Sequence, residues 1–190
     1  MKITNAMYLI ASTKRAPNSG ETVIGLKFQT APGGKGANQA VQCARLGAHV
    51  TMVGQVGDDA FGRIMTETAA SAGVDVSHVS VDRNESSGVG HITLEVSDHG
   101  AQNRITVCPG ANFTLSVEDV AWLREEIGRF DLVMMQFELP MEVIEQDGEA
   151  VLRGRVMAHL LCINALEEID CYDKVCEYTL PRRYPRPAAD

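Results

Sequence analysis

The sequence predicts an α/β fold in which a mainly parallel sheet carries helices, with a second, smaller sheet beside it. Short apolar runs alternate with amphipathic stretches, which is the order of strands and helices in parallel sheets. Glycines separate several of these segments, at positions 33, 34, 36, 47 and 73. Two alternating segments joined by a short polar turn, 89–96 and 105–108, instead predict an antiparallel hairpin.

The first part of the chain predicts strands on both sides of a glycine-rich loop and a helix. Apolar patterning predicts strands at Met7–Ala11, Thr22–Thr30 and Val50–Val53. The loop at 33–36 leads into a predicted helix over Asn38–Leu46. Gly47 ends this helix, because glycine readily adopts the left-handed conformation that follows a helix.

The second part predicts two helices, the hairpin and one buried strand. Asp58 or Asp59 caps a helix that reaches about Ala72. Ser116 opens another helix, with acidic residues in its first turn that complement the helix dipole. The apolar run Leu132–Gln136 predicts the strand at which we expect the sheet to stop.

Composition and charge exclude several functional classes. The 190 residues are 45% hydrophobic and 22% charged, which is typical of one globular domain. The net charge of -8 argues against a nucleic-acid or acidic-membrane partner, and no apolar run is long enough to span a bilayer. Five cysteines without regular spacing and the lack of a signal-peptide pattern indicate reduced thiols in the cytoplasm.

The strongest local motif is the glycine-rich stretch Pro32–Ala40. Such glycines let backbone N–H groups approach a ligand, and the following helix N-terminus favours oxygen-rich groups. A P-loop is excluded because Gly36 follows Lys35 where a serine or threonine is required. A dinucleotide fingerprint is excluded because Gln39 takes the place of its last glycine. Taken alone, the stretch fits a packing turn as well as a binding site.

With five further motifs, this stretch resembles the ribokinase branch of the PfkB carbohydrate kinases. The resemblance runs from about residue 6 to 146. It rests on the combination of Pro32–Ala40 with Ala44–Gly47, Val53–Gly62, Glu85–Val89, Pro109–Asn112 and Met135–Glu138.

The resemblance implies a Rossmann-like ribokinase fold with a small β-sheet lid that closes over a sugar. Lid strands would lie at about 20–31 and 88–108, and the lids of two subunits would clasp into a homodimer. The substrate-binding residues would be Gly34, Lys35, Asn38 and Glu138. Intact relatives would transfer phosphate from ATP, with Mg²⁺, to ribose or a similar sugar.

Each of these assignments has a structural alternative. Lys35 fits a solvated surface cation, and Asn38 fits a helix N-cap. Glu138 follows a predicted buried strand, so it also fits an exposed loop carboxylate.

The sequence departs from the family pattern in three places, so the expected fold is truncated. Counting back from Gly20, the asparagine and aspartate that hold the sugar in the family fall on Ala6 and Tyr8, and a one-residue gap restores only Asn5. The Gly-Ala-Gly-Asp run that supplies the family's general base and anion hole is absent, so no catalytic residue and no metal ligand is assigned. We expect 147–190 to be a divergent, poorly ordered tail.

These observations predict a carbohydrate kinase by lineage that is inactive as this chain. Sugar binding is expected to be weak or lost, and neither ATP nor Mg²⁺ is expected to bind. Two alternatives remain open at this point. The chain also fits a non-catalytic module that dimerises through its lid strands, or a decayed or mispredicted kinase fragment.

Overall fold

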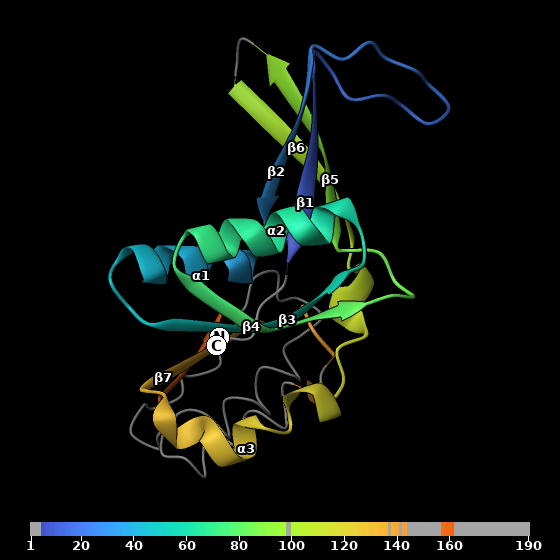
Figure 1. Ribbon diagram of the computed structural model, residues 1–190. Helices are drawn as coiled ribbons and strands as arrows, with labels where there is room; N and C mark the ends of the chain where they lie inside the picture. Colours follow the sequence, from blue (N-terminus) through green and yellow to red (C-terminus); the bar gives the residue numbers. More distant parts are fainter. Residues whose placement is uncertain (1–4, 98–99, 137, 141, 144–156, 162–190) are drawn as a thin grey trace, which may run out of the picture.

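A computed structural model describes residues 5–97, 100–136, 138–140, 142–143 and 157–161. A four-stranded sheet extends from an α/β core, as Figure 1 shows. We call this the lid sheet, since it contains the expected lid strands. Its strands lie in the order β2 (Lys27–Gly33), β1 (Ala6–Thr13), β5 (Val89–Ser97) and β6 (Gly100–Cys108).

The lid sheet confirms the predicted hairpin and corrects one strand boundary. β5 and β6 pair in antiparallel fashion from Val89–Cys108 to Ser97–Gly100. The strand predicted at Thr22–Thr30 is wrong at its start, because β2 begins at Lys27. Lys27 pairs with Ser12 near the end of β1, so the residues before it have no partner strand.

The core contains two pairs of parallel strands and two long helices. β3 (Val50–Gly57) pairs with β4 (Val74–Asp82), and α1 (Lys35–Arg45) and α2 (Ala60–Ser71) pack beside them in Figure 1. The sequence pattern did not predict β4. Its polar–apolar alternation slips by one residue between Asp75 and His78, where the ladder with β3 shifts register.

The sheet does not stop where the sequence predicts. β7 (Leu132–Gln136) pairs in parallel with β8 (Met157–Leu161) along all five residues. The expected end of the sheet at Leu132–Gln136 is therefore wrong. Apart from β8, the expected tail at 147–190 lies outside the described residues.

The helix predicted from Ser116 is broken into short turns. Three-residue turns at Glu118–Val120 and Ile127–Arg129 flank α3 (Leu123–Glu126), and another 3₁₀ turn, η1, covers Gly110–Phe113. Backbone bonds such as Arg124 N–H to Ala121 O close after three residues rather than four. The buried residues at 120, 123 and 127 are still spaced three and four apart, as on one face of a helix. All three pack in one cluster with residues of β3 and β7.

A buried asparagine joins the lid sheet to the core. The side chain of Asn112 in η1 donates from Nδ2 to the backbone oxygens of Asn5 and Pro109, both at 2.8 Å. Its Oδ1 accepts the N–H of Asn5 at 2.9 Å. A Cβ at Gly88 would lie 2.3 Å from Nδ2, so only glycine fits there. The start of β1 and the start of β5 are thereby held against η1.

Asp59 forms a second, partly buried link, and its predicted role as a helix cap is confirmed. Its Oδ1 accepts the N–H of Gly62 and the hydroxyl of Ser87, each at 2.8 Å, and Oδ2 accepts the Ser87 N–H at 2.8 Å. Burial alone raises the pKa of Asp59, but the hydrogen bonds from Ser87 and Gly62 outweigh it and lower the pKa below its ordinary value. The start of α2 is thus fixed to the loop before β5.

Within the described part of the chain, no helix is both long and apolar enough to cross a membrane.

Replacing Asp59 with alanine should lower the free energy of unfolding by about 1–2 kcal/mol, because the helix cap is lost. Since the folded pKa of Asp59 is lowered, its contribution is fully present above the unfolded pKa and is lost as the pH falls through the folded value. Urea denaturation between pH 7 and pH 3 measures both effects. Asp59→Asn, which keeps an acceptor oxygen but cannot ionise, should lose less stability with acid than wild type. Identical acid profiles for the two would contradict this role.

Candidate functional site

The candidate site begins where β2 turns into α1. Gly34 has φ +103°, a left-handed conformation that side chains rarely adopt, and it occupies the N-cap position without a side-chain cap. The N–H of Asn38 donates to Gly34 O at 3.0 Å, as the first bonds of a helix do. The alternative that Asn38 is the helix N-cap is therefore wrong.

Lys35 and Glu138 lie 103 residues apart in sequence and form an ion pair through Nζ and Oε1. Their side chains are only 30% and 35% exposed. Lys35 and Glu138 are therefore paired and partly buried, unlike the solvated cation and the exposed loop carboxylate of the alternatives. The first turn of α1 and the segment after β7 are thus joined at the point where the sequence predicted sugar contacts.

A second polar pair lies one helical turn further along α1. Gln136 at the end of β7 donates from Nε2 to Oε1 of Gln39 at 2.5 Å. Gln136 is 1% exposed, and its Oε1 has no partner among the described residues. Neither Gln39 nor Gln136 was predicted from the sequence to be a site residue. The i, i+4 spacing of Lys35 and Gln39 was the available signal, because it places both on one face of α1.

Tyr8, the residue that falls on the family's aspartate when the sequence is counted back from Gly20, packs its ring against two glycines. A Cβ added to Gly33 would lie 2.7 Å from Tyr8 Cε2, and one added to Gly90 would lie 2.7 Å from Tyr8 Cδ1. The ring therefore lies against Gly33 and Gly90, and a side chain at either position would collide with it. The same Cβ position at Gly33 is 3.5 Å from Asn38 Oδ1, so the ring adjoins the first turn of α1. Ala6 pairs with Gly33 at the same end of β1.

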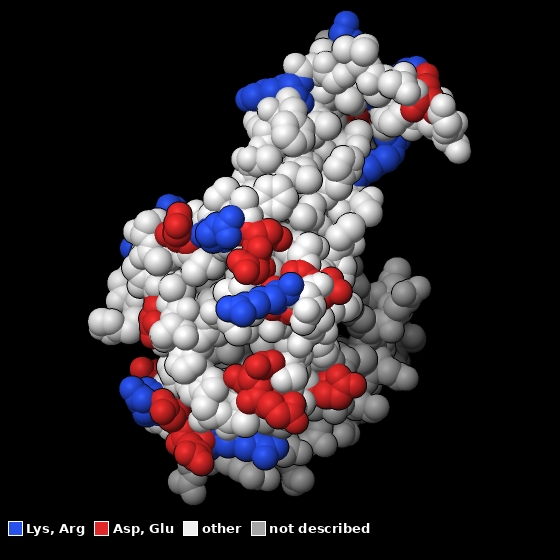
Figure 2. All heavy atoms as spheres, turned by 45° about the vertical axis from the view of Figure 1, so that its right-hand side comes forward, with Lys and Arg blue, Asp and Glu red and all other residues white. Residues whose placement is uncertain are grey.

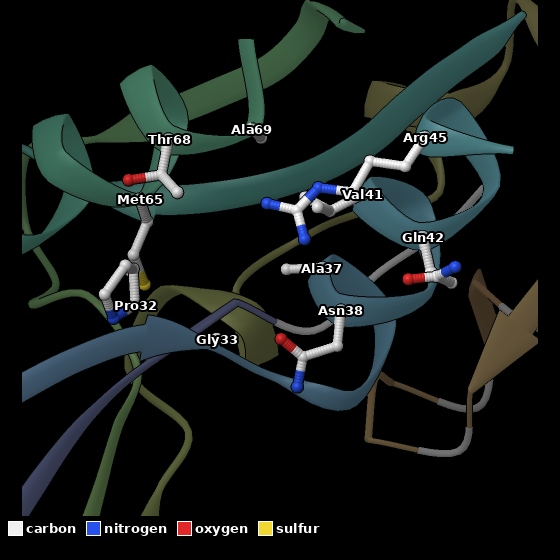
Figure 3. Close-up of a pocket in the computed structure, with 10 residues that line it drawn as sticks. All are labelled: Pro32, Gly33, Ala37, Asn38, Val41, Gln42, Arg45, Met65, Thr68 and Ala69. Atoms are coloured by element: carbon white, nitrogen blue, oxygen red, sulfur yellow. The ribbon is translucent and has the colours of Figure 1, made fainter. Parts of the chain in front are cut away.

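A cavity of about 350 Å³ adjoins the site between α1 and α2. Gly33 and Asn38 line one end, and Arg45 from the last turn of α1 extends over it, as Figure 3 shows. Lys35 and Glu138 do not line this cavity. Asn38 is the residue that connects the two regions.

The structure brings together three of the four predicted substrate residues at the start of α1 and joins them to the fourth, Glu138, through Lys35. Lys35 and Asn38 supply hydrogen-bond donors, and Glu138 supplies acceptors. Within the residues that the structure describes, no three His, Cys, Asp or Glu side chains gather as metal ligands. The arrangement suits a neutral ligand rich in hydroxyl groups.

The Lys35–Glu138 pair should contribute little to stability, since both side chains reach solvent. A double-mutant cycle with Lys35→Met and Glu138→Gln, followed by urea denaturation, should give a coupling free energy below about 1 kcal/mol. A coupling free energy several times larger would contradict this expectation. It would show that the ion pair mainly stabilises the fold and is not available to bind a ligand.

Comparisons with known proteins identify the family of the chain. The model of the pfkB family of carbohydrate kinases matches residues 1–152. The chain is similar to a ribokinase of Bacillus subtilis, with 40% identity over 141 residues, covering 74% of this chain and 47% of the relative. It is 32% identical over 179 residues to a deoxyribokinase of Salmonella typhi, covering 94% of this chain and 58% of the relative.

Solved structures show the same fold. An Arabidopsis thaliana ribokinase complexed with ribose and ATP superimposes with a TM-score of 0.72 and 31% identity, covering 84% of this chain and 51% of that one. A Giardia lamblia ribokinase gives a TM-score of 0.81 at 24% identity, covering 94% of this chain and 55% of that one. The predicted ribokinase fold is confirmed, and the chain spans about half the length of the relatives it matches. The chain belongs to the pfkB family of carbohydrate kinases.

Proposed function

We propose that this chain is the sugar-binding unit of a ribokinase-like kinase and does not catalyse phosphoryl transfer alone. The lineage activity would be ATP-dependent phosphorylation of ribose or a similar sugar. The observation that carries the proposal is the ion pair between Lys35 and Glu138, which lies near Asn38 and the lid sheet.

The chemistry of the site supports a sugar ligand. A sugar hydroxyl both donates and accepts hydrogen bonds, so its site needs both kinds of partner at fixed positions. The Lys35–Glu138 pair holds a cation and a carboxylate in place before any ligand arrives. A sugar hydroxyl inserted between them would exchange one charge-assisted bond for two.

The same site supports only weak binding. Ala6 has no polar side chain, and in the sequence count Tyr8 takes the position of the family's aspartate. Losing one charged hydrogen-bond partner costs about 1.5–3 kcal/mol. That corresponds to an affinity roughly ten- to a hundredfold lower.

The proposal that the chain is inactive rests on its sequence. The Gly-Ala-Gly-Asp run, which the resemblance links to the general base and anion hole, is absent from all 190 residues. Losing a general base lowers rates by about 10²–10⁴, and each lost anion-hole donor costs about 10²–10³ more. The Arabidopsis relative was solved with ATP and a Cryptococcus neoformans relative with ADP. We propose that this chain binds neither a nucleotide nor Mg²⁺.

We further propose that the chain acts in the cytoplasm without a nucleic-acid or membrane partner. Among the cysteines that the structure describes, Cys43 and Cys108 form no disulfide, which suits a reducing compartment. On the face shown in Figure 2, Lys and Arg side chains are scattered among Asp and Glu rather than gathered in a basic patch.

The purified chain should release no ADP when it is incubated with ribose and Mg-ATP in a coupled assay. An intact ribokinase assayed in parallel is the positive control. Turnover that disappears in Lys35→Ala or Asn38→Ala would overturn the proposal, because it would place a working active site on this chain.

Restoring the family's polar pair should restore sugar affinity. The double variant Ala6→Asn, Tyr8→Asp should bind ribose at least about tenfold more tightly than wild type in calorimetry. Tyr8→Phe, which keeps the ring, is the matched control and should leave the affinity unchanged. A double variant that folds, by circular dichroism, yet shows no gain would contradict the placement of Tyr8 in the sugar site.

A second candidate function, dimerisation through the lid sheet, is favoured by one exposed apolar face. Strand register places Ile105 and Val107 on the same face as Tyr8, because they pair with Ile92 and Gly90. Ile105 is 50% exposed and Val107 is 60% exposed. Adjacent exposed apolar side chains on a sheet favour association.

Ile105→Lys should convert a wild-type dimer into a monomer, measured by size-exclusion chromatography with light scattering. Phe28→Lys is the matched control, since Phe28 is 65% exposed but lies on the opposite face of the lid sheet, in the row of Ala11. A dimer that survives Ile105→Lys but not Phe28→Lys, or a monomeric wild type, would contradict pairing through the Tyr8 face.

A further inference from the structure

The cavity between α1 and α2 is a pocket separate from the ion pair of Lys35 and Glu138, since neither residue lines it. Its volume of about 350 Å³ is that of a small-molecule site. Apolar side chains form much of its wall, with Val41 on α1 and Met65 and Ala69 on α2, as Figure 3 shows. We call this cavity the α1–α2 pocket. Its polar groups lie toward its two ends, and they decide what it can bind.

Arg45 is the only charged residue among the ten that line the α1–α2 pocket. Its guanidinium makes no hydrogen bond or ion pair with another residue that the structure describes. The whole chain has 25 acidic residues against 17 Lys and Arg, yet no Asp or Glu lines this pocket. The pocket therefore presents one uncompensated positive charge, which favours an anionic ligand.

The position of Arg45 in the last turn of α1 offers a second role, in which a cation stabilises the end of a helix. The backbone already supplies the hydrogen bonds at that end, because the N–H groups of Leu46 and Ala48 both donate to Cys43 O at 3.1 Å. The guanidinium instead extends back along α1 over Val41, in the direction that helical side chains take (Figure 3). Its donors are therefore available to a ligand in the pocket.

The polar groups away from Arg45 are neutral and suit hydroxyl groups. Asn38 lies seven residues before Arg45, which is almost two helical turns or about 10 Å, so both lie on one face of α1. The Asn38 amide makes no hydrogen bond to another described residue, so it can both donate and accept. On α2, the Thr68 hydroxyl donates to Ile64 O at 2.7 Å, and its oxygen is left to accept a hydrogen bond from a ligand.

We propose that the α1–α2 pocket binds a phosphorylated sugar, with its phosphate on Arg45 and its hydroxyl groups on Asn38 and Thr68. A guanidinium presents paired N–H donors that match two phosphate oxygens, and a phosphate carries more negative charge than a carboxylate. A free phosphate ion would engage only the Arg45 end, whereas a sugar phosphate engages both. Carbohydrate kinases release products of this class, so the source of the ligand rests on the proposed function, but the chemistry of the pocket does not.

Isothermal titration calorimetry of the full chain at low ionic strength tests the proposal, with ribose 5-phosphate as the probe and inorganic phosphate as the comparison ligand. Ribose 5-phosphate should bind saturably and at least about tenfold more tightly than inorganic phosphate, because only the sugar phosphate reaches Asn38 and Thr68 as well as Arg45. Added sodium chloride should weaken this binding, since Arg45 is exposed. No saturable binding, or equal binding of the two ligands, would overturn the proposal.

Three protein variants locate the bound ligand. Arg45→Met removes the charge but keeps an apolar stem, and it should weaken the binding of ribose 5-phosphate at least about tenfold. Arg63→Met is the matched control and should leave binding unchanged, because the Arg63 side chain is 65% exposed on α2 and does not line the pocket. Lys35→Met, which alters the sugar site alone, should also leave it unchanged. Loss of binding in Lys35→Met but not in Arg45→Met would overturn the proposal, since the ligand would then occupy the sugar site, and the sugar-binding proposal would stand.

Discussion

Asn112 satisfies both backbone groups of Asn5 and the carbonyl of Pro109 with one buried side chain, and the placement of the lid sheet depends on these bonds. A buried polar group left without a partner costs about 1–3 kcal/mol, so each bond fixes its neighbour firmly. Gly88 permits the close approach, because any Cβ there would collide with the amide. β1 begins at the next residue after Asn5, and its direction into the lid sheet is set at this joint.

The geometry of the candidate site follows from that joint. Tyr8 lies three residues after Asn5, and its ring lies against Gly33 at the end of β2, just before α1. The other side of α1 is bonded to the β7 segment through Lys35 and Gln39. One helix therefore meets the lid sheet on one side and the core on the other. A ligand bound at its first turn would contact both parts, which is the arrangement that a closing lid needs.

In the core, the described strands form two separate parallel pairs instead of one sheet. β3 and β7 share a buried cluster, yet each has a strand on only one side among the described residues. Side-chain packing in this cluster joins the two pairs of strands. The lid sheet has no such gap, because β1 and β5 are flanked on both sides.

The sequence by itself determined the α/β class, the hairpin, the Asp59 cap, and the residues Gly34, Lys35, Asn38 and Glu138, because these depend on local pattern and on motifs. It did not predict β4, whose alternation is interrupted by a register shift, nor β8, whose pairing joins residues 25 positions apart in the ladder. Only the tertiary structure decided that Lys35 pairs with Glu138, that Asn38 is not a cap, and that the Tyr8 ring packs against Gly33 and Gly90. These facts depend on contacts between segments up to about a hundred residues apart, and such contacts form only when the packed chain brings those segments together.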